Sequence, residues 1–257
     1  MNLELDGKTA VVTGASRGIG LAIVQALLDE GVHVIGAARK APDVRIQLAR
    51  SENFTFVPAD LSSDTGAKEL AGAVPGPVDI LVNNVGSAPA RPDGFASISD
   101  EQWVQTLALN LLAAVRITRQ VLPRLRSGAA IVMIASENSI LPDPLVMDYS
   151  AAKAAVLSFT KSLSKELAPS GIRVNSVSPG PVATDLWLGT DGVAETTARA
   201  AGRTPGEIRA GAEAAIPTGR FTQPQEVARL VLVLASPTFG NITGADFVID
   251  GGMRPTL

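Results

Sequence analysis

Short apolar runs rich in β-branched residues alternate along the chain with longer segments of helical periodicity. The strand-type runs show little alternation of apolar and polar residues, which is typical of strands buried on both faces. Strand–helix–strand repetition of this kind predicts a parallel sheet with helices on both sides. We expect strands at residues 9–12, 32–37, 55–57, 80–82, 130–135, 173–177 and 245–249, and helices at 21–29, 43–50, 64–73, 100–125, 150–167 and 225–234.

This order predicts the α/β class: one doubly wound (Rossmann-type) domain spanning residues 1–257, with a seven-stranded parallel sheet and helices on both faces. No Pro/Ser-rich linker divides the chain. Residues 180–219 depart from this alternation of strands and helices and contain a series of glycines and alanines. We interpret residues 181–219 as a flap over a site, with a plain surface excursion as the alternative.

The amino-acid composition limits which kinds of ligand or macromolecule the protein is expected to bind. The formal net charge is -3, so no basic excess is present to neutralise nucleic-acid phosphates. The chain has no cysteine and one histidine, which leaves neither thiolate chemistry nor a typical zinc site, and we expect no metal. The N-terminus lacks the basic start and apolar core of a signal peptide, and no apolar run is long enough to span a membrane. We therefore expect a cytoplasmic protein that acts on a small molecule.

A glycine-rich loop follows the first strand and precedes a helix, with the spacing G-x-x-x-G-x-G. Glycines let the backbone turn sharply and approach a ligand, and the N–H groups of the following helix face an anion. This placement predicts a dinucleotide phosphate site, with a merely tight turn as the alternative. The loop residues expected to contact the cofactor are Gly14, Ser16, Arg17, Gly18, Ile19 and Gly20.

The same loop also matches G-x-S-x-G, the turn that carries the nucleophile of α/β-hydrolases. Such a hydrolase needs a histidine base later in the chain. The only histidine is His33, which opens the second predicted strand, so the sequence excludes this chemistry.

The end of the second strand predicts which dinucleotide binds. An acid about 20 residues beyond the glycines normally accepts from the ribose 2′-hydroxyl of NAD. Here Arg39 stands at that point, and the first acid, Asp43, comes too late. Arg39 and Arg17 could together hold a 2′-phosphate, since guanidinium groups match phosphate oxygens. We therefore predict a preference for NADP(H) over NAD(H), with two solvated surface arginines as the alternative.

Tyr149, the only tyrosine, stands four residues before Lys153 in a predicted helix, so both side chains lie on one face. Ser136 ends the preceding strand, at the edge of the sheet where ligands bind. A cation favours the phenolate form of tyrosine, whose ordinary pKa is about 10. At about 4 Å in a medium of effective dielectric about 20, the attraction of about 4 kcal/mol would lower the pKa by roughly 3. This predicts a tyrosine that exchanges protons near neutral pH.

At these residues the chain resembles the classical short-chain dehydrogenase/reductase (SDR) family, including its 3-oxoacyl reductases. The matching pieces occur in the family's order: Thr13 to Gly20, Asp60-Leu61, Asn83-Asn84-Val85-Gly86, Asn110, Ser136, Tyr149-x-x-x-Lys153, Pro179-Gly180 with Thr184, and Ile249-Asp250-Gly251-Gly252. The resemblance implies an NAD(P)-dependent oxidoreductase that interconverts a ketone and a secondary alcohol. It also implies a homotetramer, or a homodimer.

The resemblance assigns roles to these residues. Tyr149 would be the general acid and base, Lys153 would also hold the nicotinamide ribose, Ser136 would bind the substrate oxygen, and Asn110 would support a water chain that returns the proton. Asp60 and Leu61 would meet the adenine, and Asn84 and Gly86 would line the cofactor near its ribose. Pro179, Gly180, Val182 and Thr184 would flank the nicotinamide.

Two departures from the family pattern are Val85, where alanine is usual, and Glu137, which either contacts a polar substrate or faces solvent. The substrate stays open between 3-oxoacyl thioesters and other secondary alcohols. Leu186-Trp187-Leu188 forms either a substrate wall or a subunit contact. A non-catalytic dinucleotide sensor would not need the Ser–Tyr–Lys set. Cofactor-retaining epimerases and dehydratases of this fold usually have a longer C-terminal substrate domain.

Overall fold

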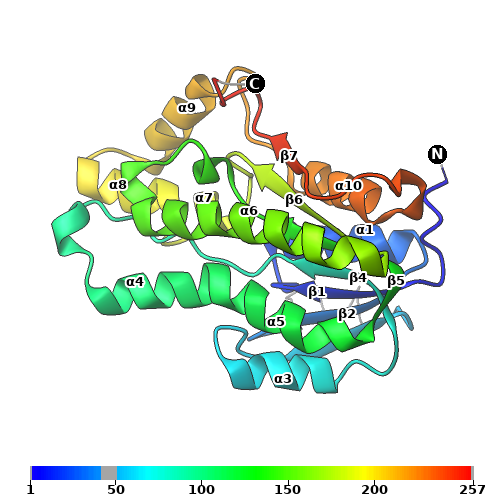
Figure 1. The fold of residues 1–257 in the computed structure, drawn as a ribbon. Coiled ribbons are helices and arrows are strands. Elements are labelled where there is room, and N and C mark those ends of the chain that lie inside the picture. The colour runs from blue at the N-terminus through cyan, green and yellow to red at the C-terminus, as the bar shows by residue number, and fades with distance from the viewer. Residues whose placement is uncertain (1, 42–50, 256–257) are drawn as a thin grey trace.

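The computed structural model describes residues 2–41 and 51–255. Seven parallel strands form one sheet in the order β3-β2-β1-β4-β5-β6-β7, as predicted (Figure 1). The strands are β1 (Thr9–Thr13), β2 (His33–Ala38), β3 (Phe54–Pro58), β4 (Val78–Asn83), β5 (Leu125–Ile134), β6 (Arg173–Pro179) and β7 (Asp246–Ile249). The order reverses between β1 and β4, which opens a crevice at the carboxyl ends of these two strands.

Helices cover both faces of the sheet and complete two apolar layers (Figure 1). One layer packs side chains of α3 (Asp64–Gly72), α5 (Ala113–Val121) and α6 (Met147–Leu167) on the sheet. The other layer packs α1 (Gly18–Asp29) and α10 (Pro224–Ala235). Successive residues of one strand enter opposite layers, Val11 the first and Val12 the second, which explains the near-continuous apolar strands of the sequence. The predicted helix at 43–50 lies outside the described residues.

The single helix predicted at 100–125 is wrong in its bounds. The chain forms α4 (Asp100–Leu107), then a π-helical turn over Ala108–Leu112, then α5, and it enters β5 at Leu125. Pro123 ends the helical run, because its ring cannot continue an α-helix. The start of β5 was missed because residues 125–129 lack β-branched side chains. The π turn, a feature often found at functional sites, carries Asn110.

Residues 181–219 contain three helices, α7 (Asp185–Leu188), α8 (Val193–Ala201) and α9 (Pro205–Ala215). They lie together at the carboxyl end of the sheet (Figure 1). Thr204 begins α9 with a capping box, and Gly202 ends α8 in a left-handed conformation, so local sequence signals set these bounds. No helix in residues 2–41 or 51–255 is long and apolar enough to cross a membrane.

Candidate active site

A cleft of about 1300 Å³ opens at the carboxyl ends of the strands and extends under α7, α8 and α9. All but one of the residues predicted for catalysis or cofactor binding line it. They are Gly14, Ser16, Arg17, Gly18, Ile19, Gly20, Arg39, Asp60, Leu61, Asn84, Gly86, Ser136, Tyr149, Lys153, Pro179, Gly180, Val182 and Thr184. Asn110 lies behind the cleft wall.

The glycine loop has the shape that a phosphate requires. Gly14 and Gly18 have φ of 66° and 54°, which favours glycine. A Cβ on Gly20 would overlap the carbonyl oxygen of Gly14, so only glycine lets α1 begin this close to the loop. No side chain caps the start of α1, which leaves its first N–H groups directed to a ligand. The loop therefore fits the pyrophosphate of a dinucleotide.

Asn84 joins the end of β4 to the glycine loop. Its Nδ2 donates to the carbonyl oxygens of Thr13 (3.0 Å) and Gly14 (3.3 Å). The Thr13 hydroxyl accepts in return from the backbone N–H groups of Asn84 (2.9 Å) and Val85 (3.1 Å). Val85, the departure from the family pattern, packs its side chain against the apolar layer of α5. The Asn84 amide thus fixes the loop at the point where the strand order reverses.

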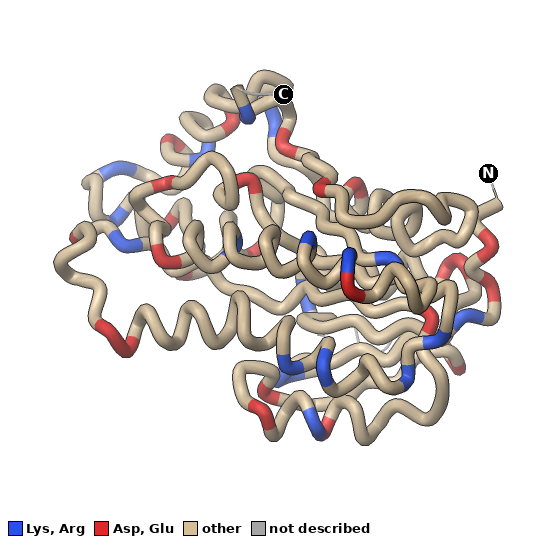
Figure 2. The backbone as a smooth tube through the Cα atoms, viewed as in Figure 1, with Lys and Arg blue, Asp and Glu red and all other residues tan. Residues whose placement is uncertain are grey.

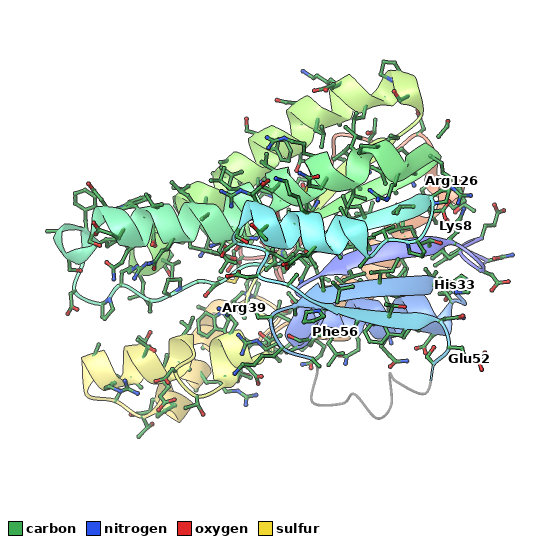
Figure 3. The ribbon with its side chains drawn as sticks, turned by 90° about the horizontal axis from the view of Figure 1, so that it is seen from below. Lys8, His33, Arg39, Glu52, Phe56 and Arg126 are labelled. Carbon is green, nitrogen blue, oxygen red and sulfur yellow. The ribbon has the colours of Figure 1, made fainter. Side chains whose placement is uncertain are left out.

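The part of the cleft next to the carboxyl end of β2 carries basic residues. Arg17 and Arg39 line it with exposed side chains, and Lys40, which sequence reasoning did not assign to the site, lies beside them. Figure 3 shows Arg39 at the opposite end of β2 from His33. The Asp60 carboxylate accepts from the hydroxyl (2.8 Å) and backbone N–H (3.1 Å) of Ser62. These bonds, with a smaller effect of Arg39, lower the pKa of Asp60. Asp43 lies outside the described residues.

Ser136, Tyr149 and Lys153 come together in the middle of the cleft. Tyr149 and Lys153 are one turn apart near the start of α6, and Lys153 Nζ lies 5.7 Å from the centre of the Tyr149 ring. The ammonium of Lys153 donates to the carbonyl oxygen of Ile134 in β5 (2.7 Å). All three side chains are buried, with 4–9% of their surface exposed.

Burial shifts the pKa of Tyr149 in the direction opposite to the one predicted from the sequence. It raises the pKa of Tyr149 to about 12, against a smaller lowering by the Ser136 hydroxyl and together with a further rise from the Glu137 charge. It also lowers the pKa of Lys153 to about 8. The predicted lowering of the Tyr149 pKa is therefore wrong for this structure, because the cost of burying the phenolate is the largest effect on this group. Tyr149 is held as a neutral phenol, the form that donates a proton.

Asn110 is buried in the π turn, where its side-chain amide makes three hydrogen bonds. Its Nδ2 donates to the carbonyl oxygens of Ser87 (2.9 Å) and Thr106 (3.0 Å), and its Oδ1 accepts from the Ser87 N–H (3.1 Å). A Cβ on Gly86 would lie 2.7 Å from Asn110 Oδ1 and 3.4 Å from Lys153 Nζ. Gly86 therefore leaves the space in which Asn110 and Lys153 approach the cleft wall.

A buried ion pair that the sequence did not indicate holds the start of α6. Asp148 accepts from Arg91 Nη2 (2.7 Å) and Nε (3.2 Å), and from the Thr106 hydroxyl (2.7 Å). Burial alone would raise the pKa of Asp148, but these bonds from Arg91 and Thr106 hold it below its ordinary value. Arg91 and Asp148 are 57 positions apart, so no local pattern connects them. The pair fixes the residue next to Tyr149.

Glu137 follows Ser136 in the cleft wall and is 8% exposed. The alternative in which this side chain faces solvent is therefore wrong. Burial raises the pKa of Glu137 to about 8, and the charges of Asp250 and Asp143 add to the rise. Asp143, Thr197 and Met253 also line the cleft and were not assigned from sequence, because nothing in their local pattern marks them.

The doubly wound sheet, the glycine loop at the reversal of strand order and the Ser–Tyr–Lys set define an oxidoreductase dependent on a nicotinamide dinucleotide. A family model described as Enoyl-(Acyl carrier protein) reductase matches residues 14–254. The chain belongs to the short-chain dehydrogenase/reductase family and resembles its 3-oxoacyl reductases. It acts on a CH–OH/C=O pair.

Similar proteins cover 98% or more of the chain. The 3-oxoacyl-[acyl-carrier-protein] reductase of Vibrio cholerae is 32% identical over 257 residues, covering 98% of this chain and 99% of that protein. The D-threitol dehydrogenase of Mycolicibacterium smegmatis is 34% identical, covering 98% and 94%. The crystal structure of L-sorbose reductase from Gluconobacter frateurii, complexed with NADPH and L-sorbose, matches with a TM-score of 0.91 and 30% identity over 100% of both chains.

Proposed function

We propose that the protein is an NADP(H)-dependent reductase of ketones, and dehydrogenase of the matching secondary alcohols, in which Tyr149 is the general acid and base. The observation that carries this proposal is the buried, neutral Tyr149 beside Ser136 and Lys153 in one cleft. The nicotinamide, when bound, supplies or accepts the hydride.

The chain's own residues handle the oxygen and the proton. Ser136 donates a hydrogen bond to the carbonyl oxygen, which gains negative charge as the carbonyl is reduced. Tyr149 then gives its phenolic proton to that oxygen, and in oxidation it removes the proton. Lys153 stabilises the phenolate left behind and holds the nicotinamide ribose. Asn110 supports the water chain that returns the proton.

The remaining cofactor contacts are proposed from the same placement. Asp60 and Leu61 meet the adenine, while Asn84 and Gly86 lie by the ribose. Pro179, Gly180, Val182 and Thr184 flank the nicotinamide, and the Thr184 side chain lies against Gly18 of the phosphate loop. Residues 181–219 form a flap that moves to admit substrate.

Turnover separates this proposal from its alternatives. We expect NADPH absorbance to fall when a ketone is added to the protein. Binding of NADPH without turnover on a panel of 3-oxoacyl thioesters, cyclic ketones and quinones would favour a dinucleotide sensor. Conversion of a substrate without net change in NADPH would favour an epimerase or dehydratase.

The preference for NADP(H) is tested at Arg39. We expect Arg39→Gln to lower kcat/KM for NADPH by about ten- to a hundredfold, because it removes a charged hydrogen-bond donor to the 2′-phosphate. The value for NADH should change by no more than about threefold. Lys8→Gln is a matched control, since Lys8 precedes β1 at the opposite end of the sheet (Figure 3). A wild-type protein that prefers NADH would refute the proposal.

We further propose a cytoplasmic homotetramer, with a homodimer as the alternative, and a small-molecule substrate. Exposed Phe95, Val104 and Leu112 on and around α4 offer an apolar surface for subunit contact. Basic and acidic residues are interspersed over the helices in Figure 2, which disfavours a nucleic-acid partner. A monomer in light scattering would contradict the assembly.

A further inference from the structure

Glu137 places a carboxyl group in the wall of the cleft, and one of its oxygens, Oε2, is buried behind the cleft surface without a hydrogen-bond partner among the described residues. Glu137 begins the short turn Glu137–Ser139 that follows β5 and Ser136. A Cβ on Gly180 would lie 2.9 Å from Oε2 of Glu137, so the carboxyl rests against the backbone of the loop that follows β6. The glycine at 180 makes room for it.

The reaction proposed above does not use this carboxyl group. Ser136, Tyr149 and Lys153 account for the carbonyl oxygen and the proton. A buried carboxyl group without a hydrogen-bond partner destabilises the fold, so such a group in the wall of a binding cleft indicates a partner on the ligand. A second orphan, the buried hydroxyl of Thr197, lies in the cleft lining contributed by α8.

The chemistry of the carboxyl restricts this partner. Burial, together with the charges of Asp250 and Asp143, raises the pKa of Glu137 to about 8. At neutral pH the group is mainly a carboxylic acid, which offers one O–H donor and one carbonyl acceptor. A hydroxyl, which both donates and accepts, is its natural complement.

The surroundings disfavour charged partners. Asp143 lines the cleft close enough for its charge to act on Glu137, and it repels an anionic substituent. An ammonium on the substrate would be attracted by this carboxylate, but it would face the buried ammonium of Lys153 in the same cleft and would lose its hydration among Leu141, Leu145 and Trp187. A neutral hydroxyl avoids both costs.

We propose that Glu137 is a specificity-determining residue that binds a hydroxyl group next to the reacting carbon, so that the substrate is a hydroxyketone and the product a vicinal diol. This inference rests on the proposed function, since it assigns a substrate class to the same site.

The test compares ketones that differ only in the hydroxyl: hydroxyacetone with acetone, and adipoin (α-hydroxycyclohexanone) with cyclohexanone. We expect the wild-type protein to favour each hydroxyketone by about ten- to a hundredfold in kcat/KM. Glu137→Leu should bring this ratio close to one. The ratio is the readout, because a general loss of structure lowers both values and leaves their ratio unchanged.

Two further variants keep the result interpretable. Glu137→Gln retains one donor and one acceptor and should retain most of the preference. Ser139→Ala removes a buried, unpaired hydroxyl from the same turn, outside the cleft lining, and should leave the ratio as it is. An absent wild-type preference, an unchanged ratio in Glu137→Leu, or a preference for aminoacetone over hydroxyacetone would overturn the proposal.

Calorimetry with hydroxyacetone and the protein saturated with NADP+ separates the two hypotheses, because no hydride is available for reduction in that mixture. Binding that weakens about tenfold or more in Glu137→Leu supports the role of Glu137, even if no ketone consumes NADPH and the proposed reductase activity fails. Equal binding to wild type and Glu137→Leu overturns the role of Glu137 while turnover stands.

Discussion

Tyr149→Phe is expected to lower kcat for ketone reduction by about a thousandfold or more. The substitution removes one oxygen atom from a buried side chain, and with it the proton that the substrate oxygen receives. Lys153 cannot take its place without rearrangement, since its ammonium is directed to the carbonyl oxygen of Ile134. NADPH should bind with a Kd within about threefold of the wild-type value, because the glycine loop and Arg39 are untouched.

The measurement is the initial rate of NADPH consumption under saturating ketone, with Kd from NADPH fluorescence. Ser158→Ala, on the exposed face of the same helix, is the matched control and should keep full activity. A Tyr149→Phe protein with more than about a tenth of the wild-type rate would show that another group supplies the proton.

Glu137→Gln is expected to make the protein more stable at pH 8 and to remove a pH dependence of its stability. Burial raises the pKa of Glu137 from 4.5 to about 8. Between these values the folded protein binds a proton that the unfolded chain releases, so the wild-type free energy of unfolding falls as pH rises. The full shift corresponds to a loss of up to about 5 kcal/mol by pH 8. Because glutamine cannot ionise, the Glu137→Gln protein should not lose this stability as pH rises.

Urea denaturation of both proteins at pH 5, 6, 7 and 8 checks this result. The difference in stability should be small at pH 5 and grow with pH, and Glu166→Gln, at an exposed position of α6, should show no such growth. Parallel curves for wild type and Glu137→Gln would mean that Glu137 is already ionised when folded at pH 5.

The sheet was predictable because strands buried on both faces carry an unbroken apolar signal. Val11 and Val12 point into different layers, and both are fully buried. The cleft residues were predictable for a different reason: the ends of parallel strands meet at one edge, so Gly14, Asn84 and Ser136 had to lie near one another. Their roles, by contrast, stay predictions until the variants are measured.

The features that could not be predicted from the sequence depend on burial and on contacts between residues far apart in the chain. The direction of the Tyr149 pKa was wrong because attraction by Lys153 can be inferred from a four-residue spacing, whereas the cost of burying the phenolate cannot. The π turn at Asn110 was missed because its residues are compatible with an ordinary helix. The neighbours of Glu137 were missed because Asp250 and Gly180 reach it from separate loops.

The ion pair between Arg91 and Asp148 has a practical consequence for engineering. The segment between β4 and α4 looks like a free surface connection that could be exchanged for that of a relative to alter selectivity. Yet it carries Arg91, which anchors Asp148, the residue beside Tyr149. Replacing this segment by one that lacks Arg91 will therefore change the orientation of the Tyr149 side chain as well as the shape of the cleft. Variant libraries designed for new substrates should keep Arg91 unchanged.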